Sequence, residues 1–153
     1  MIYFIDEDYR KLRALASELT AFHGFETKII RDADSAFREL SDIKECDVDL
    51  VIIDVMLAVN ANGESSRYSR EDTDDFHKTG IVLLDDLVLV NPDVFPKKAV
   101  YFTHASSGDL VKAISGSANK HGIRVLKKKD YNTAYDFGNE IVGIIRKNEA
   151  GAL

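Results

Sequence analysis

A run of branched apolar residues, Leu50 to Ile53, ends abruptly at an acidic residue, Asp54. The run has no polar–apolar alternation, which is typical of a strand covered on both faces within a parallel sheet. Asp54 would then lie at the carboxyl end of that strand, at the edge of an open α/β sheet where ligands bind. For this residue alone, a loop-capping role is the simpler interpretation. The polar residues at the ends of the other strands favour a ligand-binding role instead.

The rest of the chain alternates between strand and helix patterns. Further strands are predicted over residues 2–5, 25–30, 98–102 and 123–126, and each is followed by apolar residues at helical spacing. Asp34 is expected to cap the second helix, and Asn132 or Thr133 the last one. Strand–helix pairs in regular alternation predict an α/β fold, a doubly wound parallel sheet with right-handed crossovers.

Residues 59–79 interrupt this alternation with a polar, acidic stretch that has no usable period. We expect a long loop, and, because it starts a few residues past Asp54, we expect it beside the carboxyl end of the third strand. With few apolar anchors it is predicted to be mobile until a partner or a modification orders it. The helix that follows should carry Asp85 and Asp86 on a solvated face.

Composition narrows the function classes. A chain of 153 residues with 45% hydrophobic content is long enough for a single domain, residues 1–153, with a sizeable core. The net charge of −6 argues against a nucleic-acid backbone as the main partner. No stretch is apolar enough to suggest a membrane span, and the one cysteine, Cys46, cannot form an internal disulfide. We therefore expect a cytoplasmic protein that binds neither nucleic acid nor membrane.

Polar side chains gather at the predicted carboxyl ends of the strands. They are Asp6 and Glu7 after the first strand, Asp54 after the third, Thr103 after the fourth, and the lysines at 127–129 after the fifth. Carboxylates that converge at one edge of the sheet repel one another unless a cation lies among them. Hard oxygen ligands with room for water suit Mg²⁺. A hydroxyl and an ammonium group nearby would complete a cradle for a phosphoryl group attached to Asp54.

The order of these residues resembles the receiver domain of two-component response regulators, and the likeness covers nearly the whole chain. The motifs are the acidic pair Asp6-Glu7, Asp54, Thr103 and Lys128. The resemblance implies a flavodoxin-like five-stranded sheet of order 2-1-3-4-5 with helices on both faces. It also implies a signalling phosphoacceptor, not an enzyme with a turned-over substrate. Its partners would be a histidine kinase or phosphotransfer protein and a downstream protein target.

The same resemblance assigns roles at the site. Asp54 would accept the phosphoryl group, with Glu7 and Asp54 binding Mg²⁺ directly, Asp6 binding it through water, and the carbonyl of Met56 as a further ligand. Thr103 and Lys128 would contact the phosphoryl oxygens. Departures from the family pattern are Glu7 for the commoner Asp, Ala58 and Lys129 for prolines, His104 beside the threonine, and Val125 at the position of an aromatic switch residue.

The lysine that reaches the site is open to two alignments. A count without gaps from Gly122 selects Lys129, whereas placing Val125 and Leu126 in the strand core selects Lys128. We favour Lys128, because the alternative moves Lys127 into a buried apolar position at a desolvation cost of several kcal/mol.

Two other functions compete with the phosphoacceptor. One is a protein-interaction module that keeps the receiver fold without phosphorylation. The other is an aspartyl phosphatase of the haloacid-dehalogenase type, with Asp6 and Asp8 as its Asp-x-Asp, Thr103 as its second motif and Lys128 as its third. The phosphatase interpretation lacks an acidic pair after the lysine and gives Asp54 no role.

Overall fold

The strands and helices follow one another in regular alternation in the computed structural model, which describes residues 1–60, 66–106 and 108–151. The strands are β1 Ile2–Ile5, β2 Thr27–Ile30, β3 Leu50–Ile53, β4 Ala99–Thr103 and β5 Val125–Lys127. The helices are α1 Tyr9–His23, α2 Ala33–Leu40, α3 Thr79–Val90, α4 Gly108–His121 and α5 Ala134–Gly151, with short 3-10 turns at Glu45–Asp47 and Lys128–Asp130.

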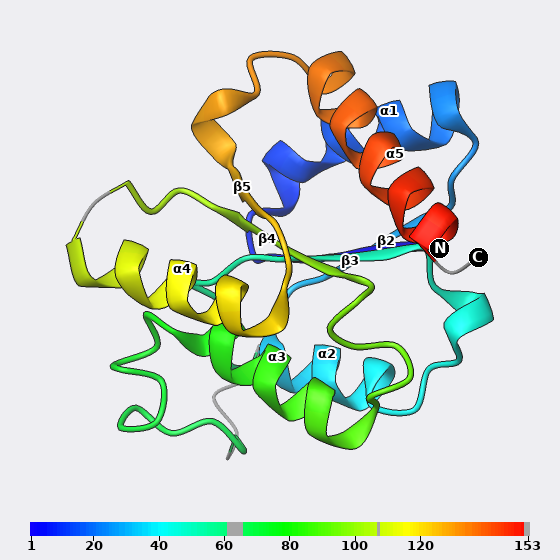
Figure 1. The fold of residues 1–153 in the computed structure, drawn as a ribbon. Helices are drawn as coiled ribbons and strands as arrows, with labels where there is room; N and C mark the ends of the chain where they lie inside the picture. Colours follow the sequence, from blue (N-terminus) through cyan, green and yellow to red (C-terminus); the bar gives the residue numbers. More distant parts are fainter. Residues whose placement is uncertain (61–65, 107, 152–153) are drawn as a thin grey trace.

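All neighbouring strands are parallel, and the sheet order is β2-β1-β3-β4-β5, which confirms the predicted fold class and strand order. Helices α1 and α5 cover one face, and α2, α3 and α4 cover the other (Figure 1). Within the described residues, no helix is both long and apolar enough to cross a membrane.

The central strand β3 explains why its sequence shows no alternation. Val51 and Ile53 point into the apolar layer beneath α2, α3 and α4, and Leu50 and Ile52 point into the layer beneath α1 and α5. All four are buried, so both faces of the strand require apolar residues. Because Ile53 is paired with Ile5 of β1, the residues that follow these two strands emerge side by side.

The starts of two helices refine the sequence prediction. Asp32, not Asp34, caps α2, since its extended backbone lets a carboxylate oxygen accept a hydrogen bond from the Ser35 amide at 2.8 Å. Asp34 already lies in the first turn of the helix, so the prediction of Asp34 as the cap is wrong. Of the two caps predicted for α5, Asn132 and Thr133, the cap is Thr133, because its hydroxyl oxygen accepts a hydrogen bond from the Asp136 amide at 3.1 Å.

The segment between β3 and α3 has no helix or strand in its described part, residues 59–60 and 66–78, whereas residues 61–65 lie outside the described residues. The expectation of few apolar anchors agrees with residues 66–79, in which Tyr68 is the one buried apolar residue. Tyr68 is 4% exposed and belongs to the core beneath α2 and α3, and Thr73 is fully buried. Mobility of the segment stays a prediction, but its second half packs against the domain.

Arg67 joins this segment to two helices. Its guanidinium carbon lies 3.4 Å from the ring centroid of Phe37 on α2, and its Nη2 lies 3.5 Å from a carboxylate oxygen of Asp86 on α3. Asp86 is therefore paired and not simply solvated as expected. The contact links residues 66–79 to both helices on this face of the sheet.

Helix α3 begins in direct contact with the backbone of Asp54. The Gly80 amide donates a hydrogen bond to the Val55 carbonyl at 2.9 Å. A Cβ atom at position 80 would lie 2.2 Å from the carbonyl oxygen of Asp54 and 2.8 Å from the Cα of Val55. Only glycine permits this approach, so the position of α3 is fixed against the peptide that carries the Asp54 side chain.

We predict that Gly80→Ala lowers the free energy of unfolding by about 2–4 kcal/mol, because backbone atoms, not a flexible side chain, must give way. Gly143→Ala within α5 is the matched control, since nothing lies within 4 Å of its added Cβ. The control should gain up to about 1 kcal/mol from helix propensity. Urea unfolding measures both variants, and equal effects would contradict the close approach at Gly80.

Candidate functional site

Asp6 and Asp54 lie next to each other at the carboxyl ends of β1 and β3. The Asp54 amide donates to the Ile5 carbonyl at 2.9 Å, and the Asp6 amide donates to the Ile30 carbonyl at 3.0 Å, so both residues continue the sheet's hydrogen bonding. Their exposed fractions are only 3% for Asp6 and 9% for Asp54. Two buried carboxylates therefore share the edge of the sheet that the sequence indicated.

Lys128 supplies the opposite charge. Its Nζ lies 2.5 Å from Oδ2 of Asp6 and 3.7 Å from Oδ2 of Asp54, and its side chain is 10% exposed. The same ammonium lies 5.5 Å from the ring centroid of Phe102 on β4. Lys127 and Lys129 are exposed on either side. The structure thus brings Lys128, not Lys129, to the two aspartates.

The charge balance at Asp54 is unfavourable for its ionised form. Burial is the main cause that raises the pKa of Asp54 to about 7, and the negative charge of Asp6 adds to it, with a smaller addition from Glu7. The charge of Lys128 and a hydrogen bond from the Met56 amide lower the pKa of Asp54 but do not offset the burial. A further cation at this edge would stabilise the carboxylate.

Thr103 is buried at the end of β4, where its hydroxyl oxygen accepts a hydrogen bond from the Ala105 amide at 3.0 Å. This bond closes the turn after the strand and leaves the hydroxyl hydrogen as a donor. The next residue, His104, is exposed at the same edge. Desolvation, followed by the charges of Lys128 and Lys11, lowers the pKa of His104, and the charges of Asp6 and Asp8 oppose this shift.

The other residues named from the sequence have different positions. Glu7 is exposed, and the Met56 side chain is 43% exposed. The Ala58 carbonyl accepts from the Ala33 amide at 2.9 Å, which attaches the loop after β3 to the start of α2 without a proline. Val125 is paired with the buried Tyr101 of β4, so the large aromatic ring lies on the neighbouring strand.

Sequence reasoning missed a cavity beside the aspartates. Its volume is about 190 Å³, and apolar walls from α1, β4 and the turn before α5 meet there. The lining residues are Asp6, Asp8, Lys11, Leu12, Leu15, Phe102, His104, Lys128 and Tyr131. The walls come from separate parts of the chain, so no local pattern in the sequence could have indicated them.

The donors suit a hard divalent cation, because Asp6 and Asp54 offer carboxylate oxygens, and the charge of Asp6 adds to burial in raising the pKa of Asp54. In residues 1–60, 66–106 and 108–151, however, no three His, Cys, Asp or Glu side chains are grouped so as to hold a metal ion. The site is a pair of buried carboxylates, with Glu7 close enough to affect the pKa of Asp54.

Several solved structures have a fold similar to that of this chain. A response regulator receiver domain protein (CheY-like) from Methanospirillum hungatei JF-1 superimposes with a TM-score of 0.65 at 17% identity, over 98% of this chain and 96% of that one. This chain has the fold of receiver domains. No protein-family model and no curated protein sequence matches it.

Two further receiver-fold structures differ in length from this chain. NtrX from Brucella abortus has a TM-score of 0.65 at 20% identity, with 99% of this chain covered but only 28% of NtrX. A Burkholderia pseudomallei response regulator, solved with a phosphorylated aspartic acid, calcium ion and citrate, has a TM-score of 0.61 at 19% identity, over 99% of this chain and 69% of that one.

The raised pKa of Asp54 predicts a pH-dependent cost to stability. The pKa of Asp54 is about 7 in the folded state and ordinarily 3.8, so the folded state retains a proton that the unfolded state loses between these values. Stability contributed by this residue therefore falls as the pH rises through that window. Asp54→Asn should raise the free energy of unfolding by about 1–3 kcal/mol near pH 8, and the gain should vanish near pH 4. Urea unfolding across that range is the measurement, and a gain that grows on acidification would contradict the assignment.

Removal of the Lys128 charge should have the opposite effect. Lys128→Met keeps much of the apolar stem and leaves two buried carboxylates without a counter-charge, so we expect a loss of about 2–4 kcal/mol at neutral pH. Lys129→Met, one residue away and exposed, should change stability by less than about 0.5 kcal/mol. Thermal unfolding of both variants decides which lysine belongs to the site.

Proposed function

We propose that this chain is a phospho-accepting receiver of a two-component phosphorelay, with Asp54 as the phosphorylated residue. The observation that carries the proposal is the meeting of Asp6, Asp54 and Lys128 at the carboxyl edge of the sheet, with Lys128 Nζ within 2.5 Å and 3.7 Å of the two carboxylates. The receiver fold supports the same function. Such a protein acts in the cytoplasm and turns over no metabolite.

The reaction is a phosphoryl transfer to a carboxylate. An Oδ atom of Asp54 attacks the phosphorus of the donor, and a new O–P bond forms as the donor's P–N or P–O bond breaks. The leaving group takes the electron pair of the broken bond and is protonated from solvent. Lys128 neutralises the incoming oxygens, and the hydroxyl of Thr103 is free to donate to them.

The metal in this proposal is Mg²⁺, which would supply positive charge next to the transferred group. Asp54 and Glu7 would hold it directly, Asp6 through water, and the Met56 carbonyl would be a further ligand. The raised pKa of Asp54 supports this set, because the carboxylate must be ionised to act as a nucleophile. The calcium ion and phosphorylated aspartic acid of the Burkholderia structure are consistent with such a site.

The donor is a histidine kinase or a phosphotransfer protein, and the output is the binding of a downstream protein. The acyl phosphate carries roughly 1.5 to 2 negative charges in place of the single charge of the carboxylate, so we expect Lys128 to exchange Asp6 for the phosphoryl group. The turns after β4 and β5 carry Thr103 and Lys128 and would move with them. The proposal therefore links a covalent change at Asp54 to the surface formed by these two turns.

A second candidate is an interaction module that keeps the fold without phosphorylation. Two observations favour it. Lys128 already forms a 2.5 Å ion pair with Asp6, and no group of three acidic or other ligating side chains is arranged for a metal in the described parts of the chain. Under this alternative, Lys128 simply compensates the charge of two buried aspartates.

Incubation with acetyl phosphate and Mg²⁺, followed by intact-mass measurement, distinguishes the two functions. The wild type should gain one phosphoryl group, and chelation of Mg²⁺ should abolish the gain. Asp54→Asn should gain none, whereas Asp93→Asn, which changes an exposed aspartate just after α3, should behave as the wild type.

Phosphate incorporation into Asp54→Asn at the wild-type level would overturn the assignment of Asp54. No incorporation in the wild type, together with no response to beryllofluoride, would favour the interaction module. An acyl phosphate is labile to hydroxylamine, so loss of the added mass on that treatment separates Asp54 from a serine or threonine ester.

A further inference from the structure

Strand β2 forms an outer edge of the sheet, and none of the described residues pairs with it on that side. Strand β2 is terminal in the sheet order and pairs only with β1. The carbonyls of Glu26 and Ile30 accept hydrogen bonds from the β1 side, so the alternate residues, Thr27 and Ile29, direct their amides and carbonyls outward. Among the described residues, no hydrogen bond is formed by the outward backbone groups of Thr27 and Ile29.

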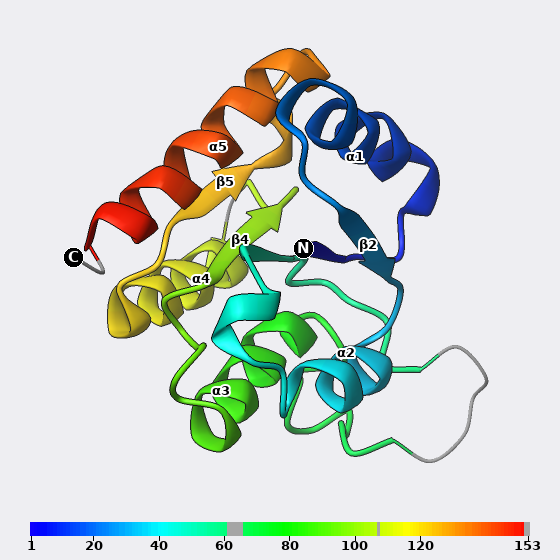
Figure 2. The ribbon, with the colours of Figure 1, turned by 90° about the vertical axis from the view of Figure 1, so that its right-hand side faces the viewer.

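A groove lies directly beside this edge. Its volume is about 370 Å³, and its walls are α1 and the half-buried side chains of β2, with α1 on one side of the strand and α2 on the other (Figure 2). The lining residues are Arg13, Ala16, Ser17, Thr20, Ala21, Thr27 and Ile29. The α1 wall is formed mostly by small side chains, so a chain added to β2 would have room for its alternate side chains.

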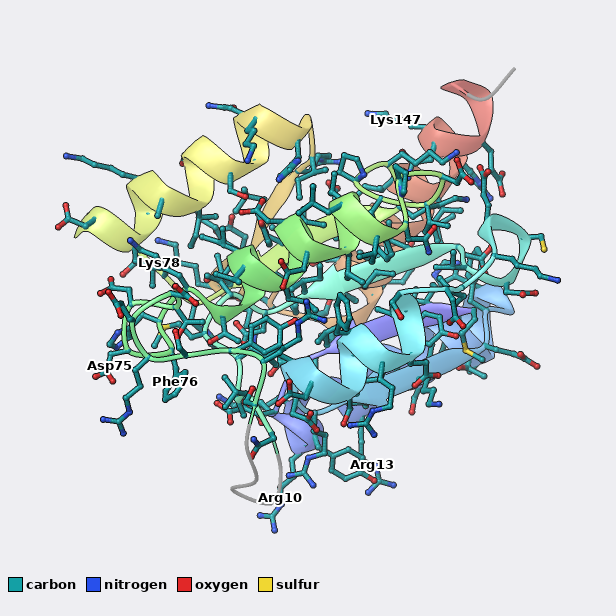
Figure 3. All side chains as sticks on the ribbon, turned by 90° about the horizontal axis from the view of Figure 1, so that it is seen from below. Arg10, Arg13, Asp75, Phe76, Lys78 and Lys147 are labelled. Carbon is teal, nitrogen blue, oxygen red and sulfur yellow. The ribbon has the colours of Figure 1, made fainter. Side chains whose placement is uncertain are left out.

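One end of the groove is positively charged. Arg13 of α1 and Arg31, just after β2, hold their guanidinium carbons 5.6 Å and 5.8 Å from the ring centroid of Tyr9. Arg10 and Arg13 project away from the ribbon (Figure 3). None of these three arginines forms an ion pair within the part of the chain that the structure describes, although the whole chain has a net charge of −6. Arg13 and Arg31 thus meet at one aromatic ring, and no described acidic residue forms an ion pair with either.

We propose that the groove between α1 and β2 binds an extended acidic segment of a partner protein, which adds to the sheet as a strand next to β2. The outward backbone groups of Thr27 and Ile29 select an extended backbone, and Arg13 and Arg31 select acidic side chains at the end of β2. This site is separate from Asp54 and does not depend on its phosphorylation. It gives the domain a second surface for protein binding.

Lys28 and the shape of the edge fit this assignment. The Lys28 side chain lies on the opposite face, where its Nζ pairs with Glu39 of α2 at 2.6 Å, so it does not fill the groove. A lysine on an edge strand discourages unselective pairing between sheets. The β2 edge therefore favours the addition of an acidic strand over that of a basic strand.

The test uses the full chain and fluorescent octapeptides of alternating valine and serine that carry two glutamates or, as a control, two lysines at one end. The glutamate peptide should bind with an affinity at least about tenfold higher than the lysine peptide, and added salt should weaken its binding. Backbone N-methylation of the glutamate peptide should abolish binding, because strand addition needs its amides.

Variants locate the site. Arg13→Glu with Arg31→Glu should weaken the glutamate peptide at least about tenfold, whereas Arg146→Glu, at an exposed position of α5, should not. Ser17→Trp, which fills the groove from the exposed side of α1, should block binding. On binding, hydrogen exchange at the Thr27 and Ile29 amides should slow, and exchange at Lys28, which already faces β1, should not change.

Absence of binding by the glutamate peptide, equal binding of both peptides, or equal binding after the double arginine change would overturn the proposal. Concentration-dependent dimerisation that Ser17→Trp abolishes would also overturn it, since the occupant would then be a second copy of the chain. Phosphorylation of the Ser17→Trp variant by acetyl phosphate, measured in parallel, should be unchanged. Failure at this groove is therefore distinct from failure of the proposed phosphoacceptor.

Discussion

The burial of two carboxylates at the end of an apolar sheet is the constraint on which the site depends. The residues of β1 and β3 are all buried. The aspartate that follows each strand, Asp6 or Asp54, is also almost fully buried. Neither would tolerate this position alone, and the ammonium of Lys128 between them offsets part of the cost. The pKa of Asp54 nevertheless remains raised, mainly by burial and further by the negative charge of Asp6.

The start of α3 contacts the backbone of Asp54, so the site is connected to the helices on that face of the sheet. Gly80 packs against the Asp54 carbonyl, so a backbone shift at Asp54 displaces the start of this helix. Arg67 pairs with Asp86 of α3 and stacks on Phe37 of α2, while Tyr68 lies in the core beneath them. The long connection after β3 therefore contacts both α2 and α3. Three consecutive residues in it, Asp74 to Phe76, have positive φ and precede the start of α3.

Patterns that depend on one strand or one helix were predictable from the sequence. The unbroken run before Asp54 indicated a strand buried on both faces, and the apolar strand core of Val125 and Leu126 placed Lys128 at the site. Contacts between distant segments were not predictable. Arg67 and Tyr68 occur in a polar stretch with no period, so the contacts of Arg67 with α2 and α3 and the burial of Tyr68 beneath them had no local signal. Asp34 was predicted as the cap of α2, and the extended backbone of Asp32 and its hydrogen bond from the Ser35 amide are visible only in the structure.

The separation of Lys128 from Asp6 along the chain, 122 positions, has a consequence for biosynthesis. Chains are synthesised from the N-terminus, so β1, β3 and both aspartates leave the ribosome well before the lysine. Until β5 has emerged, the nascent sheet carries an acidic corner without its ammonium, and solvent or a dissolved cation must screen it. The charge pair is thus completed only after β5 has been made, and a chain that stops short of Lys128 lacks it whatever else has folded.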